Sequence, residues 1–300
     1  MQKRIHQSAS ELPLEAQLKA FAAQPGFSIT VINDCGDRNE QLRIRTRLHS
    51  QFPNIPVDFC EVNGEHRDLE AAGCIIDALD AKGGGASPGI ILGNVAYREP
   101  EKSGDSNGSP FGHCLIGKVL IKSTIRGRTL SLVKDFYGIE HIRVVDPEEA
   151  LQSMVATGDL EPEWVAHIAE SQFRSYEFQP LLAARLMNGF PVPYRKETLS
   201  CPKTGAVVWW VDKHGNCKTT VTTSQCQPAP LRDGDEFATK FGTFKYFRRL
   251  NDAPRGIPAV TTGSSGLGAG PDNRFLEVAI RMGSAAKELG IKVGDGFLPE

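Results

Sequence analysis

The chain has 300 residues, of which 40% are hydrophobic and 23% charged, and its formal net charge is −2. This length suggests two domains, and the balanced charge argues against an electrostatic grip on nucleic acid or an anionic membrane. The sequence contains no run of about 18 apolar residues that would predict a membrane span. The first 26 residues lack the apolar core of a signal peptide. We therefore expect a cytoplasmic protein.

The seven cysteines are scattered along the chain, and none forms a Cys-x-x-Cys pair. This pattern favours reduced thiols over a disulfide framework or a zinc site. His214 stands near Cys217, but no second pair lies at ligand spacing, so we predict no metal.

The first half of the chain alternates between strand-like and helical patterns. Residues 1–25 predict a helical extension. After it, β-branched runs alternate with segments that carry apolar residues at helical spacing, which predicts an α/β domain with a largely parallel, mixed sheet flanked by helices. The expected strands cover 26–34, 55–62 and 88–97, and the expected helices 37–53 and 69–81.

The pattern continues less regularly up to residue 190. Residues 98–112 are polar and rich in Gly and Ser, which predicts a loop. Further strands are expected over 113–124 and 139–146. Helices are expected over 128–138, around 147–170 and over 178–189, the last ended by Gly189.

A proline-rich segment then marks a domain boundary. Proline cannot continue a helix or a central strand, so we predict an α/β domain over 26–190, a linker over 191–202 and a second domain over 203–300. The second domain contains short strand-like segments separated by turn residues, which predicts an all-β barrel or sandwich. These segments are 206–212, 217–223, 235–247 and 275–280.

The stretch VVWWVDKHGNCKTTVTT, residues 207–223, has two interpretations. Alternation places Val207 and Trp209 on one face of a strand, and Lys213 to Gly215 then form a turn. In a plain β-hairpin, Asp212 and Asn216 would satisfy backbone groups of the turn. The other interpretation is a ligand site built on that turn. The pattern alone favours the hairpin.

Several ordered motifs in the second domain bear on that choice. They are Asp-x-x-Gly-Asn at 212–216, Ser-Ser-Gly at 264–266, Leu-Glu-Val-Ala at 276–279 and Gly-Ser-Ala-Ala at 283–286. Together they resemble the C-terminal domain of the family that includes the S-adenosylmethionine hydroxide adenosyltransferases and the S-adenosylmethionine-dependent fluorinases and chlorinases. Order and spacing are kept, apart from an insertion at 267–273.

The first domain resembles the same family more loosely. ITVINDCG looks like the family's first strand, whose final Asp corresponds to Asp34. FCEVNGEHRDLEAAG resembles the entry into the second helix and carries Asp68. QFRSYEFQPLLAARLMNGFP resembles a helix that borders the family's active site and carries Phe173 and Ser175.

The resemblance implies S-adenosylmethionine as the substrate and a homotrimer as the assembly. Each site would lie between the first domain of one subunit and the second domain of its neighbour. Asp34 would hold the ribose hydroxyls, Asp212 and Asn216 the methionine ammonium and the adenine edge, and Ser264 and Ser265 the methionine carboxylate. The family's reaction is an in-line attack on the ribose 5′-carbon that releases methionine, which needs positioning and desolvation of the nucleophile.

The chain departs from the family where water would be activated. The family's Phe-His-Gly-Arg segment reads Phe173-Arg174-Ser175-Tyr176 here, and arginine cannot act as a general base at neutral pH. Ser175 matches the halogenase-like pattern and is a candidate catalytic residue, or else a helix cap. Asp68 is a second candidate, or else the cap of the helix at 69–81. The segments 96–105 and 123–127 also differ from the family.

Two functional hypotheses follow. The chain is either an enzyme that displaces methionine with water, halide or another small nucleophile, or a degenerate member that binds S-adenosylmethionine or an adenosine compound as a sensor. The Gly-rich run at 263–270 invites a third hypothesis, a dinucleotide site. We reject it because Pro271 follows directly and no strand–helix unit surrounds it. We expect Asp212→Ala to lower ligand affinity without unfolding the chain.

Overall fold

The structure is a computed structural model that describes residues 12–96, 108–226, 230–268 and 270–299. Its first part alternates helices and strands as predicted: α1 (Leu14–Ala22), β1 (Ser28–Asn33), α2 (Arg38–Gln51), β2 (Val57–Glu61), α3 (Arg67–Ala81) and β3 (Gly89–Asn94). Asp37 caps α2 by accepting hydrogen bonds from two backbone N–H groups of its first turn. The expected loop at 98–112 lies mostly outside the described residues.

The predicted single strand over 113–124 is wrong, because the structure has a hairpin there. β4 (Phe111–Ile116) and β5 (Val119–Thr124) pair antiparallel around Gly117. Gly117 has a φ of +55°, and a Cβ on it would lie 2.4 Å from the carbonyl oxygen of Gly85. Only glycine fits this position, and the apolar pattern of the flanking residues hides the turn.

The remaining elements of the first domain are α4 (Ser131–Tyr137), β6 (His141–Val145), α5 (Pro147–Ala156), α6 (Trp164–Glu170), α7 (Arg174–Glu177), α8 (Gln179–Met187) and β7 (Arg195–Thr198). The sheet has the order β2-β1-β3-β5-β4-β6-β7. The first four strands are parallel and the last three antiparallel to their neighbours. β7 falls within the predicted linker and forms the edge of the sheet, a position compatible with nearby prolines.

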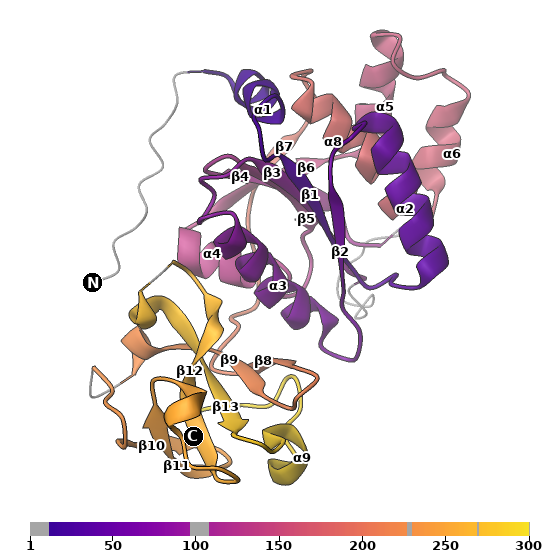
Figure 1. The fold of residues 1–300 in the computed structure, drawn as a ribbon. Coiled ribbons are helices and arrows are strands. Elements are labelled where there is room, and N and C mark those ends of the chain that lie inside the picture. Colours follow the sequence, from indigo (N-terminus) through magenta and orange to yellow (C-terminus); the bar gives the residue numbers. More distant parts are fainter. Residues whose placement is uncertain (1–11, 97–107, 227–229, 269, 300) are drawn as a thin grey trace.

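Helices cover both faces of this sheet (Figure 1). α2, α5, α6 and α8 lie on one face and bury a core that includes Ile44, Leu48 and Leu182. α3 and α4 lie on the other face, between the sheet and the second domain. Their core also takes in Trp209 and Phe275 from the second domain. The domains therefore share one apolar layer.

The second domain contains β8 (Val208–Val211), β9 (Cys217–Thr222), β10 (Glu236–Thr239), β11 (Gly242–Phe247), β12 (Pro258–Gly266), β13 (Arg274–Ile280) and the short helix α9 (Ala285–Leu289). Short 3-10 turns occupy Thr223–Gln225, Leu250–Asp252 and Pro271–Asn273. The strands form a six-stranded sheet of order β10-β11-β12-β13-β9-β8. Sequence patterns did not predict β12 or the turn between β10 and β11. The predicted fold class, an α/β domain followed by a β domain, is confirmed.

Direct contacts fix the seam between the two domains. Gly73 of α3 leaves room for the ring of Trp209, since a Cβ there would lie 2.1 Å from the indole. An Arg274 guanidinium nitrogen lies 2.7 Å from an oxygen of Asp80 on α3. Tight apolar packing and a partly buried ion pair therefore join β8 and β13 to α3.

Candidate functional site

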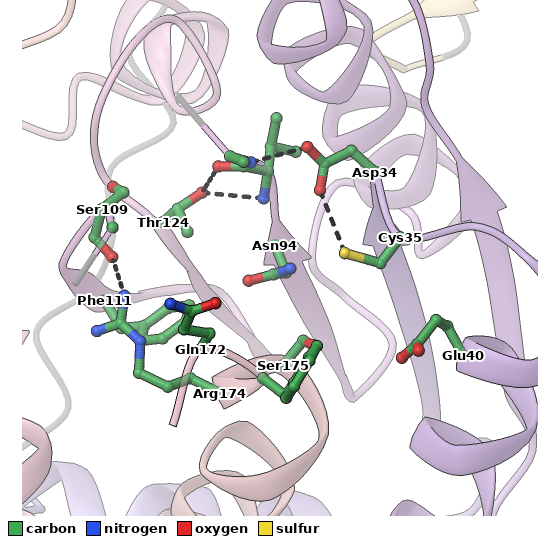
Figure 2. A pocket seen from close by; sticks show the side chains of 14 residues that line it. Asp34, Cys35, Glu40, Asn94, Ser109, Phe111, Thr124, Gln172, Arg174 and Ser175 are labelled. Carbon is green, nitrogen blue, oxygen red and sulfur yellow. Dashed lines mark hydrogen bonds between the residues drawn. The ribbon is translucent and has the colours of Figure 1, made fainter. Parts of the chain in front are cut away.

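A cavity of about 520 Å³ opens at the carboxyl ends of β1, β3 and β5 (Figure 2). This edge of a parallel sheet is where open α/β folds place ligands. Asp34 follows β1, Asn94 ends β3 and Thr124 ends β5. The first turn of α7 lies opposite them and contributes Arg174 and Ser175. The volume falls in the range of small-molecule pockets.

Asp34 is held in place by two donors to one of its oxygens. The backbone N–H of Ala96 donates to Oδ2 at 3.0 Å, and an Arg67 guanidinium nitrogen lies 3.3 Å from the same atom. Among the described residues, the other oxygen, Oδ1, accepts only from the Cys35 thiol at 3.7 Å, a weak donor. The carboxylate is thus oriented while Oδ1 keeps acceptor capacity for a ligand.

The cavity has an acidic wall and a basic wall. Figure 2 shows Asp34 and Glu40 on one side and Arg174 on the other. The Arg174 guanidinium donates to the carbonyl oxygen of Ser109 at 3.3 Å and lies 5.0 Å from the centre of the Phe111 ring. Arg174 therefore brings a fixed positive charge to the position where the water-using family members have histidine.

Phe173 and Ser175 both line this cavity, as the resemblance implies for the site. The capping interpretation of Ser175 is wrong, because Phe173 occupies the N-cap of α7 and no side chain caps that helix. Phe173 is 54% exposed and stacks on Tyr176 with ring centres 5.7 Å apart. Large exposed aromatic rings at a cavity rim offer a surface for another aromatic ring or chain.

Asp68, in the first turn of α3, is not among the residues that line the cavity. Its carboxylate accepts from the backbone N–H of Arg128 at 2.9 Å and from the Arg128 guanidinium at 3.1 and 3.2 Å. Burial alone would raise the pKa of Asp68, but these hydrogen bonds outweigh it and lower that pKa. Since His66 is the N-cap of α3, Asp68 is not the cap either. In this structure Asp68 binds Arg128.

Asp212 and Asn216 occupy the turn of the β8–β9 hairpin, so the hairpin interpretation is confirmed. One Asp212 oxygen accepts from the backbone N–H groups of His214 and Asn216 at 2.8 and 2.9 Å. The other accepts from the Asn216 amide at 2.9 Å. Burial raises the pKa of Asp212, but the hydrogen bonds from Asn216 and His214 leave it lowered. A ligand role would have to coexist with this turn network.

The two predicted serines lie in different surroundings. Ser264 is exposed, and its backbone N–H donates to Glu277 at 3.3 Å. Ser265 is buried at the domain seam, where its hydroxyl donates to Asp77 at 2.8 Å and lies 2.7 Å from the Lys218 ammonium. The Ser265 hydroxyl therefore holds the domains together, whereas Ser264 remains open to a ligand.

Glu277 is a candidate site residue that the sequence analysis did not identify. It contacts Ser264, and burial raises its pKa, with a smaller contribution in the same direction from the nearby charge of Asp212. Glu277 therefore connects the serine segment to the hairpin turn. Its place in the Leu-Glu-Val-Ala motif was the available signal. In the first domain, the missed cavity residues include Asn94, whose position at the end of a strand could have identified it.

The structure thus brings Asp34, Phe173 and Ser175 together in one cavity. The predicted residues of the second domain lie outside that cavity within one chain. Three of them, Asp212, Asn216 and Ser264, form together with Glu277 a separate group that we call the polar corner.

Residues 206–297 match the family described as the SAM hydroxide adenosyltransferase C-terminal domain. The predicted family resemblance is confirmed. That matched segment contains all four residues of the polar corner and the whole hairpin. S-adenosylmethionine-related chemistry is therefore the chemistry that this match associates with residues 206–297.

Solved structures show the same fold over nearly the whole chain. A conserved protein from Thermotoga maritima has a TM-score of 0.65 at 19% identity and covers 89% of this chain and 98% of its own. A conserved hypothetical protein from Thermus thermophilus has a TM-score of 0.57 at 18% identity, with 90% and 97% covered. No curated protein matches the chain in sequence. At this identity the two structures establish the fold alone.

No helix in the described residues is long and apolar enough to cross a membrane. Within the same ranges, no group of three or more His, Cys, Asp or Glu side chains has a geometry that could hold a metal ion.

Proposed function

We propose that the protein binds S-adenosylmethionine in the Asp34 cavity and displaces methionine from the ribose 5′-carbon with water, halide or another small nucleophile. The observation that carries this proposal is the convergence of Asp34, Phe173 and Ser175 on one cavity in a chain whose second domain matches the family. Phe173 and Ser175 come from one segment, and Asp34 comes from a segment far from it in the chain.

The cavity has the charges that this reaction needs. The ribose hydroxyls would donate to Oδ1 of Asp34, the oxygen that Arg67 and Ala96 leave open. The acidic wall of Asp34 and Glu40 suits the sulfonium cation. Because methionine leaves as a neutral sulfide from a cationic sulfur, the protein need not protonate the leaving group. Its task is to position and desolvate the nucleophile.

Arg174 supports an anionic nucleophile over a water activated by a base. A guanidinium stays protonated, so it attracts halide or hydroxide and cannot accept a proton. Ser175 then adds a hydroxyl that could donate to the anion, next to the aromatic side chain of Phe173. This arrangement favours halogenase-like chemistry at the site.

The resemblance further implies a homotrimer in which the polar corner of one subunit completes the cavity of its neighbour. Two observations support that arrangement. The polar corner does not line the cavity of its own chain, and the exposed Phe173 leaves an uncovered aromatic surface at the rim. The trimer and the cytoplasmic location stay predictions.

A second function, binding without turnover, has its own support. The family's histidine is replaced by Arg174, and Asp68 is engaged by Arg128, so no base faces the described cavity in the family's usual manner. A protein with these features could retain S-adenosylmethionine and act as a sensor.

One assay separates the two functions. The full-length protein is incubated with S-adenosylmethionine, with and without chloride, and free methionine, adenosine and 5′-chloro-5′-deoxyadenosine are quantified. We expect methionine release above the spontaneous rate, abolished in Asp34→Asn and retained in the surface control Glu140→Gln. Tight binding without release would establish the sensor, and neither binding nor release would refute both functions.

A further inference from the structure

A second cavity lies on the opposite face of the first-domain sheet from α2 and α8. It has a volume of about 410 Å³ and is bounded by β1, β2, α3 and β8. Its lining includes Cys60 of β2, Cys74 and Asp77 of α3, and both Trp209 and Trp210 of β8. None of these residues lines the Asp34 cavity, so this second cavity is chemically independent of the proposed function.

Two thiols meet in this cavity. The Sγ atoms of Cys60 and Cys74 are 3.3 Å apart, although the residues come from a strand and a helix. No other pair of cysteine sulfurs is in hydrogen-bond contact within the described ranges. Cys114, by comparison, is buried in the apolar core, and Cys226 lies next to a backbone carbonyl.

The hydrogen bond between the two thiols shifts their pKa values in opposite directions. The hydrogen bond with Cys74 lowers the pKa of Cys60, although burial and the charge of Asp77 act against this effect. The same hydrogen bond, together with burial, raises the pKa of Cys74 well above its usual value. A thiolate is the nucleophile in thiol oxidation, so Cys60 is the attacking sulfur and Cys74 the resolving one.

The charges around the pair are mixed. Asp58, Asp77 and Lys218 line the cavity, and the Lys218 ammonium lies 3.6 Å from a carboxylate oxygen of Asp77. Hydrogen peroxide is small and neutral, so neither sign of charge opposes its entry to Cys60.

We propose that Cys60 and Cys74 form a modification site, a dithiol that hydrogen peroxide converts reversibly into a disulfide. The Cys60 thiolate attacks one oxygen of the peroxide, the O–O bond breaks, and the other oxygen departs as hydroxide. Cys60 is then a sulfenic acid. The Cys74 sulfur then attacks the Cys60 sulfur, the S–O bond breaks, and a second hydroxide leaves. The two thiols lose two electrons and two protons, and the peroxide becomes two waters.

The fold permits this closure. The sulfurs must move from 3.3 Å to about 2 Å apart, the length of a disulfide bond. β2 is the edge strand of its sheet and pairs only with β1, so Cys60 can shift without breaking a second ladder. The bond would tie this edge strand to α3, directly beneath the two tryptophans of β8.

The test uses the full-length protein. It is treated with hydrogen peroxide, quenched with catalase, denatured and alkylated with N-ethylmaleimide, and its intact mass and peptide map are measured. We expect two of the seven free thiols to be lost, one cross-linked peptide pair containing Cys60 and Cys74, and full recovery with dithiothreitol. Seven alkylated thiols after treatment, or a cross-link between other cysteines, would overturn the proposal.

Variants separate the roles of the two sulfurs. In Cys74→Ser, oxidation should stop at a Cys60 sulfenic acid that dimedone captures, whereas Cys60→Ser should form no disulfide. The control Cys201→Ser removes another half-buried thiol and should still form the cross-link. Equal dimedone capture in the wild type and in Cys74→Ser would show that Cys74 does not resolve the intermediate, which contradicts the proposal. The wild-type mass measurement decides the question even if a variant fails to fold.

Discussion

The Asp34 carboxylate is positioned before any ligand arrives, and this positioning sets what the residue can do. Arg67 and the backbone of Ala96 both bind Oδ2, and the side chain is only 3% exposed. A carboxylate held in this way need not reorganise when a ribose binds, so its hydrogen bonds contribute to affinity at little entropic cost. Its neighbour Cys35 offers only a weak thiol donor.

Asp34→Asn tests this role directly. The amide keeps the shape of the side chain but accepts weaker hydrogen bonds and loses the ion pair with Arg67. Hydrogen bonds to charged groups contribute about 1.5–3 kcal/mol, so we expect S-adenosylmethionine affinity to fall about 10- to 100-fold. Calorimetry measures the affinity, with Glu140→Gln as the surface control. Equal affinity in the wild type and in Asp34→Asn would show that Asp34 does not contact the ligand.

We expect Asp212→Ala to have two effects, one on the stability of the hairpin and one on ligand affinity. The variant loses three hydrogen bonds of the turn, which should lower the free energy of unfolding by about 1–3 kcal/mol without unfolding the chain. It should also weaken S-adenosylmethionine binding if the polar corner contacts the ligand. Thermal melting and calorimetry measure the two effects. Lys213→Ala changes the same turn without these bonds, and if it weakened binding equally, the effect would belong to the turn and not to Asp212.

The sequence predicted the positions of the candidate residues better than it predicted their contacts. The motif positions identified Asp34, Phe173 and Ser175, which do share a cavity. Ser265 could not be separated from Ser264 by sequence, because only the packing of α3 against β12 turns the Ser265 hydroxyl toward Asp77. The partner of Asp68 was equally hidden, since Arg128 is 60 residues away in the chain.

Helix α3 connects the sites described above. Its first turn carries Arg67, which binds Asp34, and Asp68, which binds Arg128. Further along, Gly73 lies against Trp209 and Asp77 contacts the second domain. The helix therefore links the Asp34 cavity to the domain seam through a single rigid element.

Arg128→Met should lower the free energy of unfolding by an amount that depends on pH, because it removes the guanidinium that binds Asp68 on α3. The lowered pKa of Asp68 means that the folded state holds its proton less tightly than the unfolded state. The stabilisation is therefore fully present above the ordinary pKa of the carboxyl and is lost as pH falls through the lowered one. We expect a loss of about 1–3 kcal/mol in the free energy of unfolding at pH 7.

Urea unfolding at several pH values measures this difference. It should shrink toward zero in strong acid, where Asp68 is protonated in both variants. The control is Arg195→Met, which removes an exposed arginine near Glu197 and should change little at any pH. A difference between wild type and Arg128→Met that does not depend on pH would contradict the assigned partner.

The boundaries of helices and strands could be predicted where apolar residues recur at a clear helical or strand spacing. They could not be predicted where this spacing is unclear. α3 and β1 follow directly from their apolar spacing. The hairpin at Gly117 was missed because apolar residues run through both strands. β12 was missed because its Gly-Ser segment resembles a loop and becomes a strand only through pairing with β13. Tertiary pairing overrides local propensity at such positions.

The core of the first domain contains a buried histidine whose ring nitrogens form no hydrogen bond with the described residues. His113 of β4 is 1% exposed, and neither ring nitrogen has a hydrogen-bond partner among the described residues. Burial, with smaller contributions from Arg143 and Lys122, lowers the pKa of His113 from 6.5 to about 3. The folded protein therefore keeps this ring neutral where the unfolded chain binds a proton.

Acid unfolding should reflect this difference. Below about pH 6.5 the unfolded state gains a proton that the folded state excludes, so stability falls as pH drops from that value toward 3. In His113→Leu this dependence should be flatter, whereas the exposed control His141→Leu should keep the wild-type slope. Circular dichroism across the pH range measures both. Identical slopes in wild type and His113→Leu would contradict the buried neutral state.

The arrangement of domains, as opposed to their class, could not be predicted from one chain of sequence. Alternating patterns indicated an α/β half and a β half. The shared apolar layer depends on Trp209 packing against Gly73, a contact that no local pattern encodes. In the proposed trimer, the relation between the Asp34 cavity and the polar corner would depend on contacts between subunits, which local sequence patterns do not encode.

The most direct test of the proposed binding mode is a crystal structure of the protein grown with S-adenosylmethionine. We expect the ribose hydroxyls on the Asp34 carboxylate, the sulfonium near Ser175, and the base and amino-acid tail on the Asp212–Asn216 turn of a neighbouring subunit. A ribose bound elsewhere, or a lattice and assembly in which Asp34 is remote from every copy of Asn216, would contradict it.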